Sequence, residues 1–419
     1  MKILLLFIVF LILPGAGHTQ ALDDSDISSR SIGVLRGTLE SEGRREGRIL
    51  VFPAQRLSPS SGRDAVYGRS LYGVFLAPDD KGNMHPGRFA QVSLKDSKGV
   101  AAQTRADSQG HWTLELSPGL KGRYSIRFRL DNKFWKFEHN GSYEWEGPSV
   151  TLPLEGPVDT GTYGIAPDAE NAQAAQIHQA YIDTVSLFEG SGAGIGWWKK
   201  TVNVVWPGSG DYYSPWRYEI NLTNGKAWDV NIHELGHFIM HVAVKSRSGG
   251  GQHYFDRCYD DALAWTEGFP TFLAAAVRLD KNGADPTFEY LVPRRAPVQI
   301  ENIPGDVCIG PTNEWRVAAA LWDLFDTHED GNDRFNMEFN RLWGAIALKR
   351  STIPGFNGAF ELLKDELSSE EIPLAKAAVD HALFWTPGPG LAGFSIIPKI
   401  TFPALTSFPD FDGCTKTYR

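Results

Sequence analysis

The chain has 419 residues, more than one hydrophobic core usually supports, so we expect two or three folding units. Hydrophobic residues make up 42% of the sequence and charged residues 22%, which is the balance of a soluble globular protein. The formal net charge of −9 argues against a nucleic-acid or anionic-membrane partner, because both need clustered Lys and Arg.

The N-terminus has the pattern of a secretory signal peptide. Lys2 precedes an uninterrupted apolar run from Ile3 to Leu13, and the small residues Gly15-Ala16-Gly17 follow. The run is shorter than the roughly 20 residues that cross a bilayer. We therefore expect residues 1–21 to be removed, and the mature protein to be secreted, extracellular and without a membrane span.

Secretion would allow two modifications, N-glycosylation and disulfide formation. Asn140 and Asn221 each begin an Asn-x-Ser/Thr triplet and are the expected glycosylation acceptors. In an oxidising compartment three cysteines form one disulfide and leave one thiol over. Cys258 and Cys308 lie in one segment, whereas Cys414 lies near the C-terminus, so we expect the bridge between Cys258 and Cys308.

Residues 32–160 read as short strands separated by turns. Apolar residues alternate with polar ones around Val92, from Trp112 to Leu116, and from Tyr124 to Leu130. Such alternation places one face of a strand on a core and the other in water. The pattern predicts an N-terminal antiparallel β-sandwich, in which residues 32–85 either add strands or form a separate module.

Part of this region resembles a known type of module. The run from Val92 to Gly99 is followed by Asp107-Ser-Gln-Gly110 and by the strand that begins near Trp112. Over residues 88–152 this pattern is similar to transthyretin-like, carboxypeptidase-regulatory-like domains. The resemblance implies a small β-sandwich.

The pattern changes near Pro167. Asp168 is a plausible helix N-cap, and the next apolar residues recur at helical spacing. Two short strands follow, and residues 229–384 are mostly helical. We therefore predict a linker at 155–167, a mostly helical α+β domain at 167–386, and a tail at 387–419. The two strands are expected at 202–206 and 219–222.

The segment His233-Glu234-Leu-Gly-His237 carries the chemistry. Asp229 can cap a helix here, and on a helix His233 and His237 lie one turn apart on one face, where both imidazoles can bind one Zn²⁺. Glu234 is rotated about 100° from His233. Its carboxylate can therefore reach a zinc-bound water and take its proton.

A catalytic zinc needs a third protein ligand. His241 lies on the same helix face but about 12 Å along the axis from His233, too far to share the ion. The remaining candidates are His253, which a glycine-rich loop could return, Asp260 or Asp261, and Glu267.

The sequence around Glu267 favours it. Thr266 can cap a helix that begins there, and Pro270 would then fall in the first turn, where a missing N–H does no harm. Gly268 permits a close approach to a neighbouring helix. We expect Glu267 to be the third ligand.

These residues resemble a family. His233-Glu-Leu-Gly-His237, followed by Trp265-Thr-Glu267-Gly-Phe-Pro-Thr-Phe, is similar to the gluzincin group of zinc metallopeptidases over residues 200–385. The resemblance implies one catalytic zinc ion and a zincin-like peptidase domain. It also implies His233, His237 and Glu267 as ligands, and Glu234 as general acid/base.

Two details remain open in this resemblance. Many gluzincins have an Asp four residues after the ligand Glu, where it supports a zinc-bound His, and here that position is Thr271. Gluzincins also stabilise the oxyanion with a Tyr or His, and the sequence does not choose among its candidates. Glu314 reads as a charge at the start of a core helix. The oxyanion candidates are Tyr254, Tyr259, Tyr290, His328 and Arg316.

The sequence therefore predicts a secreted zinc-dependent metallopeptidase that hydrolyses protein or peptide substrates through a zinc-bound water activated by Glu234. One alternative is a secreted β-sandwich binding or adhesion protein whose zincin domain is inactive. The other is a zinc hydrolase that acts on a non-peptide bond. An intact set of ligands together with the base favours the peptidase.

Overall fold

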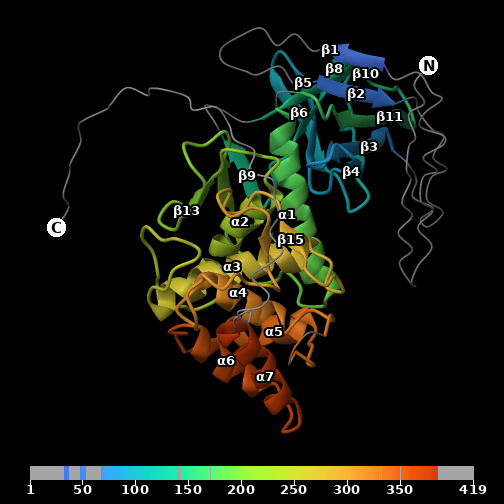
Figure 1. Ribbon diagram of the computed structural model, residues 1–419. Coiled ribbons are helices and arrows are strands. Elements are labelled where there is room, and N and C mark those ends of the chain that lie inside the picture. Colours follow the sequence, from blue (N-terminus) through green and yellow to red (C-terminus); the bar gives the residue numbers. More distant parts are fainter. Residues whose placement is uncertain are drawn as a thin grey trace, which may run out of the picture.

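The structure is a computed structural model, shown in Figure 1. It describes residues 33–36, 48–52, 68–138, 143–169, 171–329, 331, 333–349 and 351–385. The expected signal peptide, Asn140, Cys414 and the expected tail lie outside the described residues. Across the ranges that are described, no helix combines the length and apolar character that a membrane span requires.

Two sheets form the N-terminal β-sandwich, at the top of Figure 1. The first sheet has the order β1-β2-β11-β3-β4, and β7 also pairs with β3. Its strands are β1 (Gly33–Arg36), β2 (Arg48–Phe52), β3 (Ser70–Pro78), β4 (Met84–Pro86), β7 (His111–Glu115) and β11 (Pro157–Ile165). The second sheet, in the order β10-β8-β5-β6, contains β5 (Gln91–Asp96), β6 (Gly99–Arg105), β8 (Arg123–Arg129) and β10 (Trp145–Thr151).

The alternation in the sequence produces the sandwich core. In β8 every second side chain is buried, and Phe128 stacks on Phe75 of the other sheet with ring centroids 4.4 Å apart. Trp112 and Tyr163 of the first sheet also contact Phe128. Aromatic side chains from both sheets therefore form one core between them.

Two expectations about this region need correction, and one open alternative is decided. The sandwich is not purely antiparallel, because β11 runs parallel to β3. Of the two alternatives for residues 32–85, the described parts add strands, since β1, β2 and β3 lie in the first sheet. The expected linker at 155–167 is largely strand β11, which is hydrogen-bonded on both sides. Its Gly and Pro residues had suggested a break in structure.

A third sheet joins the two halves of the chain. Its order is β13-β14-β12-β9, from β9 (Trp135–Glu138), β12 (Val202–Val205), β13 (Tyr212–Ser214) and β14 (Glu219–Asn221). Strand β9 comes from the predicted sandwich region, yet it pairs in parallel with β12, as Trp135 does with Val202. The strands predicted near 202–206 and 219–222 are confirmed as β12 and β14.

Helix α1 (Ala172–Gly190) runs from the sandwich down beside the other helices, as Figure 1 shows. Its His178 is fully buried and accepts a hydrogen bond at Nδ1 from Nε1 of Trp135, 3.0 Å away. Arg278 at the end of α3 contacts Asp80 of the sandwich and, at 2.7 Å, Asp183 of α1. The sandwich and the helical part therefore share buried contacts.

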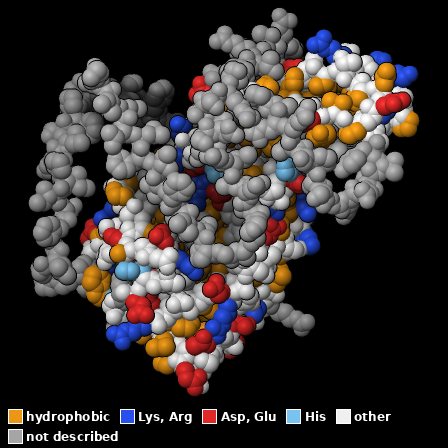
Figure 2. Space-filling view, turned by 90° about the vertical axis from the view of Figure 1, so that its right-hand side faces the viewer, with side chains coloured by type: hydrophobic (Ala, Val, Ile, Leu, Met, Phe, Trp, Pro, Cys, Tyr) orange, Lys and Arg blue, Asp and Glu red, His pale blue; other side chains and the backbone are white. Residues whose placement is uncertain are grey.

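The remaining helices form the lower part of the molecule. They are α2 (Trp228–Ala243), α3 (Asp261–Arg278), α4 (Glu314–Trp322), α5 (Phe339–Ile346), α6 (Phe356–Lys364) and α7 (Glu371–Phe384), with a small hairpin of β15 (Thr287–Phe288) and β16 (Val298–Gln299). Figure 2 shows acidic and basic side chains intermixed over the lower, helical end of the molecule. Surface ion pairs such as Arg341–Glu371, at 2.7 Å, belong to this part.

Two helix starts differ from the prediction. Asp229 does not cap α2. Its buried carboxylate instead accepts hydrogen bonds from the backbone N–H groups of Tyr290 and Leu291, at 2.7 and 3.0 Å. Helix α3 begins earlier than expected, capped by Asp260 rather than Thr266. Pro270 consequently lies inside α3.

Candidate metal centre

Helix α2 presents the two histidines of the motif on one side. Nε2 of His233 and Nε2 of His237 are 3.1 Å apart, and both side chains are mostly buried. The single turn between them produces this proximity. The apolar residues on the other faces of α2, among them Ile232 and Leu235, are fully buried and fix the helix in the core.

Close packing of α2 against α3 adds the third side chain. A Cβ on Gly236 would lie 2.8 Å from Cα of Pro270, so only glycine lets the two helices approach this closely. Glu267 projects from α3 into the gap. Its Oε2 lies 3.3 Å from Nε2 of His233 and 3.2 Å from Nε2 of His237.

The spacing of these three atoms fits a zinc ion. Ligand atoms placed tetrahedrally at 2.0–2.1 Å from one ion are about 3.3 Å apart. The three separations of 3.1, 3.2 and 3.3 Å match this edge length. These three side chains, from His233, His237 and Glu267, could hold a metal ion. They would occupy three corners of the tetrahedron and leave the fourth for another ligand.

Thr271 contacts His233 at the position where many gluzincins have an Asp that supports a zinc-bound histidine. Its Oγ1 lies 3.0 Å from Nδ1 of His233, and the residue is 1% exposed. The hydroxyl can accept a hydrogen bond from Nδ1–H, which turns Nε2 of His233 toward Glu267. A threonine one turn beyond Glu267 can therefore orient the histidine as a carboxylate would.

Glu234 lies beside the three-residue group without joining it. The side chain is 7% exposed, and among the described residues its Oε2 has no hydrogen-bond partner. Burial raises the pKa of Glu234; His237 and His233 oppose that rise and Glu267 adds to it. A buried carboxyl with a raised affinity for protons is suited to accept one from a nearby water.

His237 and Glu267 shift each other's pKa, so protons compete with a metal ion for this group of residues. Burial alone would lower the pKa of His237, but the adjacent carboxylate of Glu267 raises it to about 9. The pKa of Glu267, which burial would raise, is held well below its usual value by His237 and His233. Since a metal must displace the imidazolium proton, metal affinity should rise with pH up to about 9.

Glu314 and His253 lie beside the three-residue group. Glu314 begins α4, as expected, but it is also part of the centre: it is 5% exposed, and its Oε2 lies 3.3 Å from Nε2 of His253. The same nitrogen of His253 is 3.7 Å from Oε2 of Glu267. A Cβ on Gly268 would collide with Val317 at 2.5 Å, so this glycine admits α4. The signal available in the sequence was an acidic residue at the start of a helix that is apolar apart from Arg316.

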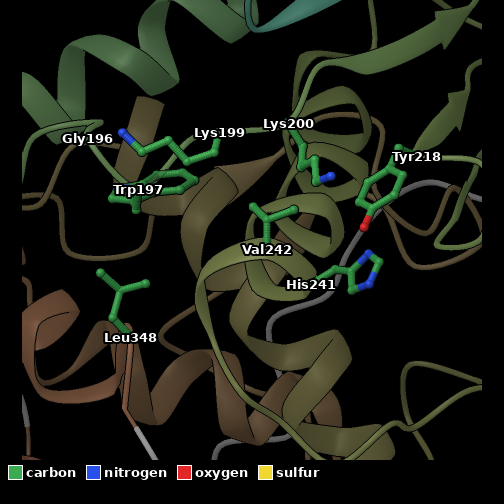
Figure 3. Close-up of a pocket in the computed structure, with 8 residues that line it drawn as sticks. All are labelled: Gly196, Trp197, Lys199, Lys200, Tyr218, His241, Val242 and Leu348. Atoms are coloured by element: carbon green, nitrogen blue, oxygen red, sulfur yellow. The ribbon is translucent and has the colours of Figure 1, made fainter.

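Three other candidates for the third metal ligand, Asp260, Asp261 and His241, lie elsewhere on α2 and α3. Asp260 accepts hydrogen bonds from the backbone N–H groups of Ala262 and Leu263, and Asp261 begins α3. His241 lies at the far end of α2, where Nδ1 is 2.7 Å from the Tyr213 hydroxyl. Figure 3 shows it beside Tyr218 in a pocket of about 520 Å³.

The oxyanion candidates are also used in other ways. Arg316 is buried, and its Nη1 donates to the carbonyls of Ala382 and Trp385. The Tyr259 hydroxyl accepts from the backbone N–H of Tyr254 at 2.8 Å. The guanidinium groups of Arg257 and Arg294 each lie 4.7 Å from the centroid of the Tyr254 ring. The backbone N–H groups of Tyr290 and His328 donate to the carboxylates of Asp229 and Asp326, and these hydrogen bonds do not involve the Tyr290 and His328 side chains.

Two modification sites can be compared with the structure. The predicted disulfide between Cys258 and Cys308 is confirmed, and it joins the segment before α3 to the segment before α4. Asn221 is 5% exposed in β14, and its amide nitrogen donates to Glu219 at 3.0 Å. Burial in a strand argues against a glycan on Asn221.

Comparison with known proteins supports a peptidase. Residues 194–356 match the family model described as the Mycolysin C-terminal domain, and this segment contains α2, α3 and α4. The match supports a metallopeptidase family, whose substrates are proteins or peptides. No curated protein matches the chain.

Among solved structures, a 9R-lipoxygenase from Cyanothece PCC8801 is similar at 13% identity, with a TM-score of 0.17, over 34% of this chain. The chain spans about a quarter (26%) of that protein.

Proposed function

We propose that this protein is a secreted zinc-dependent metallopeptidase. His233, His237 and Glu267 would hold one Zn²⁺, and Glu234 would act as general acid/base. The observation that carries the proposal is the triangle of ligand atoms, 3.1 to 3.3 Å on each side, next to a buried carboxylate that is not part of it.

Each residue then has a defined part in hydrolysis. Bound zinc supplies a Lewis acid that polarises the scissile carbonyl and makes a water easier to deprotonate. Glu234 takes the proton of the attacking water and later hands it to the leaving amine. Burial favours this role, because it increases the affinity of Glu234 for the proton between the two steps. Thr271 keeps the ring of His233 in one orientation.

The rival functions fit the same residues less well. A binding protein with an inactive zincin domain has no use for an intact ligand set together with an adjacent base. A hydrolase of non-peptide bonds would need both, but the Mycolysin C-terminal domain match supports a peptidase. The secreted location rests on the N-terminal sequence and agrees with the disulfide.

Glu234→Gln tests the proposal. The amide keeps the size of the side chain but cannot accept the proton, so zinc content should stay near one equivalent at the primary site while peptide hydrolysis falls at least about 10²-fold. Glu289→Gln, on the exposed surface near β15, is the matched control and should change neither quantity. His233→Ala should lose both metal and hydrolysis, because two ligands hold zinc poorly.

The outcomes separate the three functions. Zinc content is measured by elemental analysis, and hydrolysis with casein and a broad peptide library. Zinc-loaded wild type that cleaves no peptide at any pH contradicts the peptidase and favours the binding protein. If Glu234→Gln instead removes hydrolysis of an ester or amide outside that library, the non-peptide hydrolase is correct.

A further inference from the structure

We propose that the centre has a second divalent-cation site, formed by His253, Glu267 and Glu314, with Glu267 shared between the two ions. The ligand atoms of these three residues all lie within 4.8 Å of one another. The inference goes beyond the proposed function, and it rests on the proposed first site through Glu267.

The hydrogen bonding of His253 leaves its Nε2 for a cation. Nδ1 lies 3.0 Å from the carbonyl oxygen of Gly251, which can only accept, so Nδ1 carries the hydrogen. Nε2 can then present a lone pair, as in histidines that ligate metals while a backbone carbonyl fixes the other nitrogen. This nitrogen faces Oε2 of Glu314 at 3.3 Å and Oε2 of Glu267 at 3.7 Å.

Glu314 is the second, independent indication. Its side chain is 5% exposed, and within the described part of the chain its Oε2 has no hydrogen-bond partner. A buried carboxylate without such a partner is costly unless a cation or a proton compensates for it. Glu234 and Glu267 are buried nearby, so Glu314 is the third carboxyl group in a region with little access to water. A cation bound by Glu314 and His253 would compensate for the missing hydrogen bond.

The protein holds this group in place before any ion binds. Asn313, the residue before Glu314, donates its side-chain amide to the carbonyls of Phe255 and Arg257, at 3.0 and 2.9 Å. The loop that carries His253 is thereby fixed to the start of α4. The disulfide from Cys258 to Cys308 joins the same two segments. One imidazole and two carboxylates form a ligand set that suits zinc, cobalt or manganese.

Zinc titration of the full-length chain, freed of metal by a chelator, tests the site. Calorimetry and elemental analysis should find about two zinc ions per wild-type chain. Glu314→Gln and His253→Gln should each lose the weaker ion and keep the tighter one. Their matched controls, Glu289→Gln and His111→Gln, are exposed and should bind as wild type does. Thermal melting of each variant shows that it is folded.

Cobalt gives a readout that does not depend on activity. With Co²⁺ in both sites, the shared carboxylate should couple the two ions magnetically, and Glu314→Gln should restore the signal of an isolated ion. A single bound ion in wild type and in both variants overturns the proposal and means that a proton joins His253 to Glu314. One ion with peptide hydrolysis leaves the proposed function intact, whereas two ions without hydrolysis support the second site and contradict the peptidase function.

Discussion

The metal centre and the junction between the two halves of the molecule are built in different ways. At the centre two helices, α2 and α3, bring together three polar side chains at separations near 3 Å. At the junction β9 pairs with β12 across the core, and Trp135, fully buried, contacts the rings of His178, Tyr181 and Trp198. Chemistry depends on the first region, and stability depends on the second.

The two regions differ in how far apart in the sequence their contacting residues lie. The two histidines of the metal centre are four residues apart, so local helix geometry places them. The partners at the junction, such as Trp135 and Val202, are far apart in sequence and meet only in the folded chain. Because β9 completes the sheet beside the helical part, we expect the two halves to fold as one unit.

Replacing Trp135 should therefore have the largest effect on stability. Trp135→Ala removes a fully buried indole and should lower the free energy of unfolding by about 3–5 kcal/mol. Trp216→Ala is the matched control: its ring is 96% exposed, and the change should stay within about 0.5 kcal/mol. Urea denaturation followed by circular dichroism measures both.

The shape of that transition also tests the junction. One cooperative transition, shifted to lower urea, supports a single unit. Two transitions, of which only one responds to Trp135→Ala, would mean that the halves fold separately. A chain that begins near Thr162 would then fold without β9, as the expected linker had suggested.

Much of the centre could be predicted because its signals are local. The spacing of His233 and His237, and the Gly that follows Glu267, predict the group that the structure brings together. The third side chain arrives by a tertiary contact between α2 and α3, which Gly236 permits, whereas Gly268 admits α4. Alternating strands predict the sandwich for the same reason, since period-two burial is a local property.

The rest required tertiary information. Glu314 reads only as a charge at the start of a core helix, because nothing near it in sequence shows that His253 lies beside its carboxylate. Strand β11 resembles a linker, since its Gly and Pro residues are compatible with an irregular strand. Asp229 resembles an N-cap until its carboxylate is seen to bind the backbone of another loop. Each of these residues acts on a partner distant in sequence.

A smaller effect is expected from Thr271, which supports the metal centre from behind. Thr271→Val keeps the shape but removes the hydroxyl that contacts Nδ1 of His233. Zinc affinity should fall about 10- to 100-fold while the fold remains. Thr266→Val, in the same helix, loses a hydroxyl that binds only backbone carbonyls and should leave affinity unchanged. Equal affinities in competition with a chelating dye would show that packing alone orients the ring.

The last expected effect concerns pH and returns to the junction. His178 is buried with Nδ1 toward Trp135 and Nε2 donating to the Arg88 carbonyl; burial lowers its pKa to about 3, although that hydrogen bond opposes the shift. Below pH 6.5, the ordinary pKa of histidine, His178 binds a proton in the unfolded chain but stays neutral in the folded chain down to about pH 3. Stability should therefore fall with decreasing pH between 6.5 and about 3, by up to about 1.4 kcal/mol per pH unit from this residue.

His178→Gln isolates that contribution, because the amide can accept from Trp135 and donate to Arg88 without titrating. Urea denaturation of metal-free protein between pH 4 and 6, a window of about two units inside the titration range, should show a shallower loss of stability in the variant than in wild type. His111→Gln, on the exposed side of β7, should follow the wild-type slope. If wild type and His178→Gln lose stability in parallel, water reaches His178 in the folded chain, and the junction is looser than its buried contacts imply.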